Sequence, residues 1–275
     1  MDLIYQKTLE KATAGDINAF QSLFAEFQDQ LKSYLFRIIA SRADAEDIAH
    51  DTFIRAFDKL SSFQHKASLK TWVFQIATNL AYNELKKRKR WDLDVAQQAK
   101  TLVMGNPALA QRIEHVAHSS PYGTYEIKEH IDTCFTCIGK NLPIENQVAL
   151  LLKDVYDFSL REIMKILDKT EGQVKYYLQA ARQAMTDTFD QRCALVNKEG
   201  TCHQCSELNG WFNPKQNQQE AKMKIRMVRD AAKVDKEKLF ALRIQLIKGI
   251  DPLKSDGNAL QEILMDCNRM AMGEL

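Results

Sequence analysis

Two adjacent stretches decide the fold, DAEDIAHDTFIRAFDKL (Asp44–Leu60) and SLKTWVFQIATNLAYNELKKRKR (Ser68–Arg90). In both, apolar residues recur at three- and four-residue spacing, the period of a helix with one buried stripe. The residues off this stripe are mostly acidic in the first stretch, whereas the second ends in the basic cluster Lys86–Arg90. We therefore expect two amphipathic helices whose exposed faces carry opposite charge and bind different partners.

The composition bounds the remaining possibilities. A chain of 275 residues is long enough for two small domains and an extension. The formal net charge is only +2, so any nucleic-acid contact must come from local basic patches. No apolar run is long enough to span a membrane, and the N-terminus lacks the pattern of a signal peptide. We expect a cytoplasmic protein, in which cysteines are reduced, metal-bound or redox-active rather than joined in structural disulfides.

A second helical segment follows after residues 92–123, which lose the apolar period and contain Gly105-Asn106-Pro107. These residues predict a linker with one short helix near Pro107–His118. Beyond it, Ser159 with Glu162 and Thr170 with Gln173 are capping boxes that open two short helices joined by a tight turn. That arrangement is a helix-turn-helix.

Together, Asp44–Arg90 and the segment LPIENQVALLLKDVYDFSLREIMKILDKTEGQVKYYLQAARQAM (Leu142–Met185) resemble regions 2 and 4 of bacterial RNA polymerase sigma factors. The closest group is the extracytoplasmic-function class of the sigma-70 family. The resemblance implies an all-α protein without enzymatic activity. It implies region 2 at 1–91 and region 4 at 124–190. With these, the residues of the other segments predict five parts in all, adding a linker at 92–123, a cysteine-rich segment at 191–214 and a helical extension at 215–275.

The resemblance also implies partners, which are core RNA polymerase (its β′ clamp helices and β flap), promoter DNA and an anti-sigma factor. The residues implied to bind core polymerase are Asp44, Glu46, Asp47, Asp51 and Asp58. Those implied to bind DNA around the −10 element are Phe63, Gln64, His65, Lys66, Lys70, Trp72, Asn79, Asn83, Lys86, Lys87, Arg88, Lys89 and Arg90. Those implied to bind the −35 element are Glu171, Gln173, Lys175, Tyr176, Gln179 and Arg182. The family usually has more Arg or Lys on this last helix, so the isolated domain is expected to bind duplex DNA weakly.

The cysteines form two groups around the second domain, His130-x3-Cys134-x2-Cys137 and Cys193-x8-Cys202-x2-Cys205. Zn²⁺ takes four tetrahedral nitrogen or sulfur ligands, and neither group supplies an obvious complete set. The simplest solution is one structural Zn²⁺ shared by Cys134, Cys137, Cys202 and Cys205. His130 and Cys193 are alternates or belong to a second ion. Two other interpretations stay open: buried cysteines that only fill the core, and a Cys202–Cys205 redox pair.

Residues 215–275 predict two further helices and a last helix at Ala259–Met270, with no readable role. A stand-alone zinc- or redox-responsive helix-turn-helix regulator is the main alternative to a sigma factor. A thiol oxidoreductase is less consistent with the sequence, because its Cys-x2-Cys motif would sit in a βαβ context and no strands are predicted.

Overall fold

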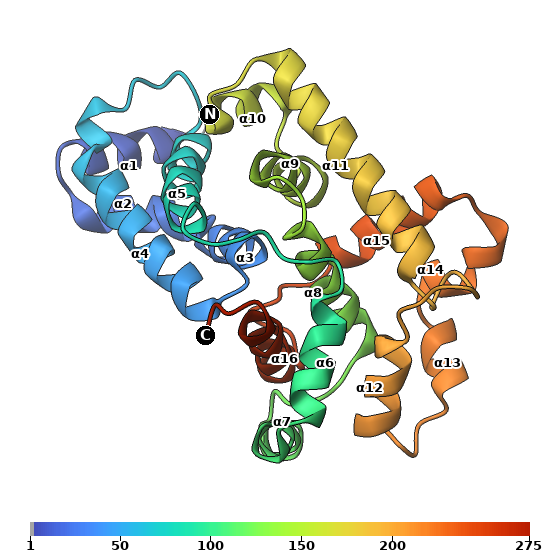
Figure 1. Ribbon diagram of the computed structural model, residues 1–275. Coiled ribbons are helices and arrows are strands. Elements are labelled where there is room, and N and C mark those ends of the chain that lie inside the picture. Colours follow the sequence, from blue (N-terminus) through green and yellow to red (C-terminus); the bar gives the residue numbers. More distant parts are fainter. Residues whose placement is uncertain (1–2) are drawn as a thin grey trace. The chain divides into compact units, whose positions relative to one another are not determined.

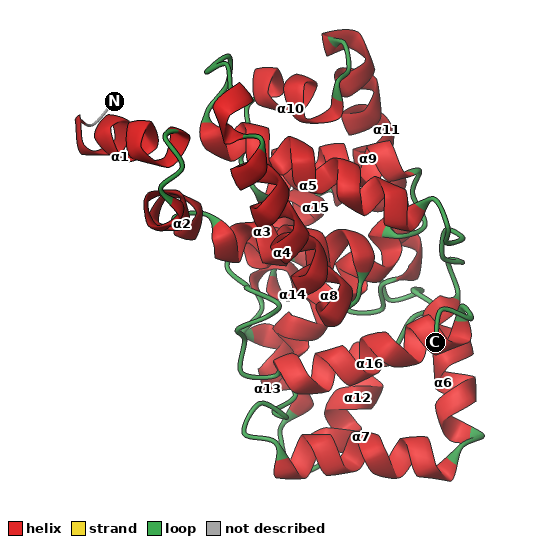
Figure 2. Ribbon diagram, turned by 90° about the vertical axis from the view of Figure 1, so that its left-hand side faces the viewer, coloured by secondary structure: helices red, strands yellow, loops and turns green. Residues whose placement is uncertain are grey.

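The computed structural model describes residues 3–275, and within this range it contains helices and no named strand (Figure 2). The all-α prediction is confirmed. No helix in the described part of the chain has the length and apolar character needed to cross a membrane. The helices, in chain order, are α1 (Leu3–Thr13), α2 (Ile17–Ala25), α3 (Gln28–Ile39), α4 (Arg42–Asp58), α5 (Leu69–Leu85), α6 (Val95–Met104), α7 (Pro107–Ser119), α8 (Ile127–Gly139), α9 (Ile144–Leu150), α10 (Leu160–Leu167), α11 (Glu171–Arg192), α12 (Gln204–Phe212), α13 (Gln218–Met223), α14 (Arg226–Arg229), α15 (Lys236–Lys248) and α16 (Asn258–Ala271). Two short 3₁₀ helices, η1 (Leu60–Ser62) and η3 (Ala231–Lys233), and a π-helical segment, η2 (Leu151–Val155), complete the set.

The helices begin where polar side chains can bind the free backbone N–H groups of the first turn. The Ser41 hydroxyl accepts a hydrogen bond from the Asp44 backbone N–H at the start of α4. Ser159 and Glu162 form the reciprocal capping box of α10. Gln173 and Thr170 make the same reciprocal bonds at the start of α11. These helix starts confirm the capping signals read from the sequence.

By its internal contacts the chain divides into two compact units. The first contains Met1–Arg88 and Leu151–Lys175, and the second contains Lys89–Leu150 and Tyr176–Leu275. The five parts implied by the family resemblance remain predictions, because they are functional segments and a division by contacts does not test them.

Aromatic rings fill the core of the first unit. Phe20, on α2, lies with its ring centroid 5.1 Å from that of Phe53 on α4. Phe74, on α5, is fully buried, with centroids 5.2 Å from Tyr34 and 4.8 Å from Phe158. Phe158 lies just before the N-cap of α10, so the same cluster fixes α10 against α5. Figure 1 draws α10 in yellow-green and α5 in teal.

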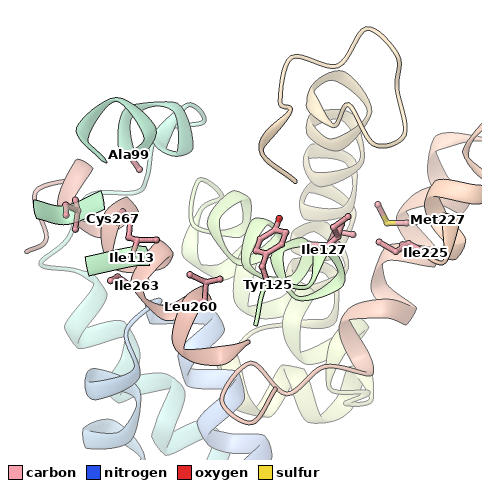
Figure 3. Packing of buried hydrophobic residues seen from close by; sticks show 11 residues of the cluster. Ala99, Ile113, Tyr125, Ile127, Ile225, Met227, Leu260, Ile263 and Cys267 are labelled. Atoms are coloured by element: carbon pink, nitrogen blue, oxygen red, sulfur yellow. The ribbon is translucent and has the colours of Figure 1, made fainter. Parts of the chain in front are cut away.

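The second unit packs α6, α7 and α8 against α16, the last helix of the chain (Figure 1). Ile113 of α7 and Leu260 and Ile263 of α16 belong to one buried apolar cluster with Tyr125 and Ile127 (Figure 3). Residues 92–123, predicted to hold one short helix, hold two: α7 is confirmed, and α6 was missed. Helix α6 contacts α16. Its Ala99 belongs to the buried apolar cluster and its Val103 packs against that cluster, so α6 forms part of the core of the second unit.

Candidate polymerase and promoter interfaces

The acidic residues of α4 lie on its solvent side. Glu46, Asp47, Asp51 and Asp58 are exposed, while Ala45, Ala49 and Ala56 are buried on the opposite face. Asp44 differs from the other acidic residues, because its carboxylate accepts a 2.7 Å ion pair from Arg88. Four of the five predicted polymerase-binding residues therefore form an exposed anionic face, and the fifth also holds the end of α5.

The connector between α4 and α5 shapes a cavity of about 480 Å³ that Tyr5, Phe63 and His65 help to line. The ring of Phe63 is buried between His65 and Trp72, with centroid distances of 4.6 and 5.2 Å. His65 has a φ of 56°, in the left-handed region that non-glycine residues seldom adopt. Gln64, His65 and Lys66 are exposed, so the polar groups of this connector point outward around a buried aromatic floor.

On α5, Asn79 and Asn83 are exposed and lie one helical turn apart, on one face. Lys70 is half-buried, and its ammonium lies 4.9 Å from the centroid of the Phe158 ring. Burial lowers the pKa of Lys70, and the nearby carboxylates of Glu162 and Asp157 oppose this shift. Of the predicted DNA contacts on this helix, the two asparagines are open to solvent, whereas Lys70 is engaged by the segment that precedes and includes α10.

The basic cluster Lys86–Arg90 separates into two kinds of residue. Lys86, Lys87 and Lys89 are exposed. Arg88 pairs with Asp44 and Glu84, and Arg90 donates to the Gly139 carbonyl and to Gln147 Oε1 at 2.6 Å. Burial lowers the pKa of Arg90 to about 10. The three lysines thus extend into solvent, with Lys87 also paired to Glu84 at 3.4 Å, whereas the arginines serve the fold.

The helix-turn-helix consists of α10, a turn at residues 168–170 and α11. Asp168 ends α10 in the left-handed conformation that a helix C-terminus often requires. Its predicted DNA-contacting residues on α11 are all exposed: Glu171, Gln173, Lys175, Tyr176, Gln179 and Arg182. Tyr176 is 66% exposed, which is unusual for a large aromatic side chain and suits a contact surface.

The cysteines do not gather as the sequence suggested. Asn268 donates to Cys137 Sγ at 3.2 Å, and Cys137 contacts Met265, so this thiol faces α16. His130 also faces α16, through a 3.2 Å hydrogen bond to Gln261. Cys193 pairs with Cys202 through an isolated parallel backbone bridge.

The electrostatics of the thiols show which of them are neighbours. Burial, followed by the thiols of Cys202, Cys205 and Cys193, raises the pKa of Cys134 well above its ordinary value. Burial likewise raises the pKa of Cys205, with Cys193 and Cys202 next in importance. For Cys202, burial raises the pKa, and a hydrogen bond from the Gln204 backbone N–H lowers it in part. Cys134, Cys193, Cys202 and Cys205 line one small cavity, which Cys137 also borders, and sequence reasoning placed Cys193 only among the alternates.

Two family models match the chain, one at each of the two predicted interfaces. The model for Sigma-70 region 2 matches residues 23–91, which include α4, the connector and α5. The model for Sigma-70, region 4 matches residues 136–185, which include the helix-turn-helix. Residues after 185, with the cysteines at 193–205 and α12–α16, lie outside both models.

Curated relatives match two thirds of the chain. The chain is 30% identical to the ECF RNA polymerase sigma factor SigW of Bacillus subtilis over 186 residues, which are 67% of this chain and 96% of SigW. It is 29% identical to the ECF RNA polymerase sigma-E factor of Escherichia coli over 184 residues, which are 66% of this chain and 91% of that protein. Among solved structures, CnrH in complex with the cytosolic domain of CnrY matches with 17% identity and a TM-score of 0.48, covering 66% of this chain and 95% of CnrH.

Proposed function

The chain belongs to the extracytoplasmic-function sigma factors of the sigma-70 family, which direct RNA polymerase to promoters, and we propose that it does so through three separate surfaces. Sigma factors are not enzymes, so these surfaces bind and position but catalyse nothing. The observation that carries the proposal is that α4 and the part of α11 within the region 4 match both present their polar residues to solvent.

The first surface is the acidic face of α4, formed by Glu46, Asp47, Asp51 and Asp58, which binds the clamp helices of the β′ subunit. A cluster of like charges on one helix face steers a basic partner and fixes its register more than it adds affinity. The Asp44–Arg88 ion pair holds α4 and the end of α5 together, so that this face and the basic end of α5 keep a fixed spacing.

The second surface comprises the connector and α5, which hold the −10 element. The cavity beside Phe63 and His65 takes an unstacked base, since its aromatic floor provides stacking and Gln64 and Lys66 stand exposed beside it. Asn79 and Asn83 contact the strand along α5. Lys86, Lys87 and Lys89 neutralise phosphates next to it.

The third surface is the exposed face of α11, which enters the major groove of the −35 element. Gln179 can form paired hydrogen bonds with a base edge, and Lys175 and Arg182 hold phosphates. The oxygen of the Gln173 side chain caps the start of α11 by accepting from Thr170, so this residue has only its Nε2 group to donate to a base. Lys175 also pairs with Glu171 at 2.7 Å, so it must leave that partner or share it on binding DNA.

We also propose that the chain contacts the β flap of core polymerase and binds an anti-sigma factor. It acts in the cytoplasm and holds a structural zinc ion in its cysteine-rich segment. The sigma function itself needs no metal ion, so the zinc serves the fold of the extension. The main competing function is a helix-turn-helix regulator that binds duplex DNA without polymerase.

Run-off transcription tests the proposal, with the purified chain and core RNA polymerase on a library of promoter fragments. Asp47→Lys combined with Asp51→Lys should abolish both run-off transcription and binding to a β′ clamp-helix fragment. Glu10→Lys combined with Glu237→Lys makes the same charge change at exposed positions outside α4 and outside the cavity beside Phe63, and should leave both intact. Specific duplex binding without polymerase, together with no run-off product, would favour the competing regulator.

A further inference from the structure

We propose that Cys134, Cys193, Cys202 and Cys205 are the four ligands of a structural zinc ion that joins α8 to the C-terminal extension. This set replaces the one that the sequence favoured, because Cys193 takes the place of Cys137. The inference concerns residues largely outside both family models and does not depend on the sigma function.

A closed turn brings three of the four cysteines together. Cys202 N donates to the Arg192 carbonyl at 2.7 Å, and Ala194 N donates to the Cys202 carbonyl at 3.1 Å, so the two ends of the turn lie side by side. Cys205 follows on the first turn of α12, three residues after Cys202. Cys193 and Cys202 therefore lie side by side, and Cys205 follows three residues later. Closely spaced cysteines of this kind are common ligands of a tetrahedral zinc ion.

Gly200 allows this turn to close. A Cβ atom at this position would lie 2.7 Å from the Cys193 carbonyl carbon and from the Ala194 nitrogen. No real side chain tolerates backbone atoms that close, so only glycine lets the chain return to Cys193. The turn is therefore shaped around the approach of Cys193 and Cys202.

Cys134 supplies the fourth thiol from α8, which lies in the same compact unit as the turn. All four cysteines line one small cavity of about 60 Å³, together with the apolar side chains of Phe189 and Leu195. The Tyr125 hydroxyl donates to the Cys205 carbonyl at 3.3 Å, which ties the start of α8 to α12 beside this cavity. A cavity of this size admits an ion and excludes a larger ligand.

A buried cation beside the thiols is the second, independent observation. Arg243 of α15 is only 3% exposed, its Nη2 lies 3.3 Å from Cys193 Sγ, and its guanidinium carbon lies 3.4 Å from the Phe189 ring centroid. No carboxylate pairs with this guanidinium in the described part of the chain. A buried cation needs a compensating negative charge. Four thiolates and one Zn²⁺ carry a net charge of −2, so the bound site would supply that charge, and Arg243 would hold Cys193 in its ligand position.

His130 and Cys137 border the same cavity but are engaged elsewhere. His130 meets Gln261, and Cys137 meets Met265 and Asn268, all on α16. Residues 3–275 as they stand contain no group of three or more histidine, cysteine or acidic side chains already arranged to hold a metal. The proposal therefore includes a closing step, in which the four sulfurs rotate inward to about 2.3 Å from the ion as they lose their protons.

The test is metal analysis of the full chain purified under reducing conditions. The wild type should carry one zinc ion per chain. Replacement of the ion by Co²⁺ should give the sulfur-to-cobalt charge-transfer and visible absorption bands of a tetrahedral site with four thiolates. Cys134→Ser, Cys193→Ser, Cys202→Ser and Cys205→Ser should each lose the ion or its four-thiolate spectrum. Cys137→Ser and Cys267→Ser, which change buried thiols of the same unit, should retain both.

A variant that keeps four possible ligands guards against simple misfolding. Cys134→His should retain zinc. Its Co²⁺-substituted form should show a weaker sulfur-to-cobalt charge-transfer band than the wild type, as expected for three thiolates and one imidazole. A wild type that holds no zinc, even after zinc is added to the reduced protein, would overturn the proposal. Loss of zinc in Cys137→Ser with full retention in Cys193→Ser would overturn the ligand set. Metal analysis does not depend on transcription, so a failure of the zinc proposal can be distinguished from a failure of the proposed sigma function.

Discussion

The interiors of the two units differ in chemical character. In the first unit, Phe20, Phe74 and their aromatic neighbours form a continuous cluster, in which the hydroxyls of Tyr34 and Thr78 lie 2.7 Å apart. The buried guanidinium of Arg37 is paired there, donating to the Tyr156 hydroxyl at 2.7 Å. In the second unit the interior holds carboxylates, amides and basic groups, among them Glu129, Lys140 and Gln261. Apolar contact is tolerant of pH and ionic conditions, whereas buried polar groups are stable only when paired. The second unit should therefore respond to protons and metal where the first responds mainly to lost volume.

The largest expected effect is a cavity in the aromatic core. Phe74→Ala removes a fully buried ring that contacts Tyr34 and Phe158, and should destabilise the first unit by about 3–5 kcal/mol. Urea titration measures the loss. Hydrogen exchange should show it in peptides from α3, α4 and α5, with peptides from α16 little changed. An equal loss of hydrogen-exchange protection in both units would mean that they unfold together. The difference between their interiors would then have no effect on their separate stabilities.

A smaller effect is expected where α16 begins. A Cβ atom at Gly257 would overlap the Glu129 carboxylate and the Thr124 carbonyl, so Gly257→Ala must displace the start of α16. We expect a loss of about 1–3 kcal/mol, confined to the second unit. Gly172→Ala is the matched control, because a Cβ there meets open space. Similar unfolding midpoints for the two variants would contradict the close approach.

The polar interior should also be sensitive to pH. Burial raises the pKa of Glu129 from 4.5 to about 7, with Lys128 opposing the shift, and Glu129 Oε2 has no hydrogen-bond partner among the described residues. The folded state then binds a proton more tightly than the unfolded state, so stability should fall as pH rises from about 4.5 to about 7. Glu129→Gln should remove that slope and stabilise the protein by about 1–2 kcal/mol at pH 8. Unfolding free energies at pH 5 and pH 8 measure it, with exposed Glu237→Gln, in the same unit, as the control that keeps the slope.

The smallest effect on stability is expected at the exposed lysines. Replacing Lys86, Lys87 and Lys89 with alanine should change the free energy of unfolding by no more than about 0.5 kcal/mol. The log–log salt dependence of promoter binding by the holoenzyme should fall by about one unit per lost phosphate contact. Arg88→Ala should instead lower stability, because it breaks the pairs with Asp44 and Glu84. An unchanged salt slope in the lysine variant would show that these residues are only solvated charges.

Sequence reasoning succeeded where local chemistry determines structure. The caps at Ser159 and Thr170 were predicted because a side-chain oxygen three residues before a backbone N–H decides a helix start locally. The acidic face of α4 was predicted because the helical period sorts side chains into faces. The last helix, expected at Ala259–Met270, is found at Asn258–Ala271.

Contacts between residues far apart in the chain could not be predicted from the sequence. Arg88 and Arg90 looked like members of a uniform basic cluster, since nothing local shows that Asp44 and Gln147 will receive them. Helix α6 was missed because its buried residues, Val95 and Ala99, are few and small, and they become core only against α16. In the proposed zinc site Cys193 takes the place of Cys137, because helical spacing gives the face of one helix but not which neighbour that face meets. The Cys-x8-Cys-x2-Cys spacing was the one signal that favoured Cys193.

Glu274 has a practical consequence for anyone handling this protein. Its carboxylate accepts a 2.7 Å hydrogen bond from Trp91 Nε1 and lies 3.7 Å from the ammonium of Lys140, which is 1% exposed. Trimming the final two residues to tidy an expression clone would strip a buried lysine of this carboxylate. Affinity tags are better placed ahead of α1. The indole of Trp91 also offers an intrinsic fluorophore whose emission should report whether the tail is seated.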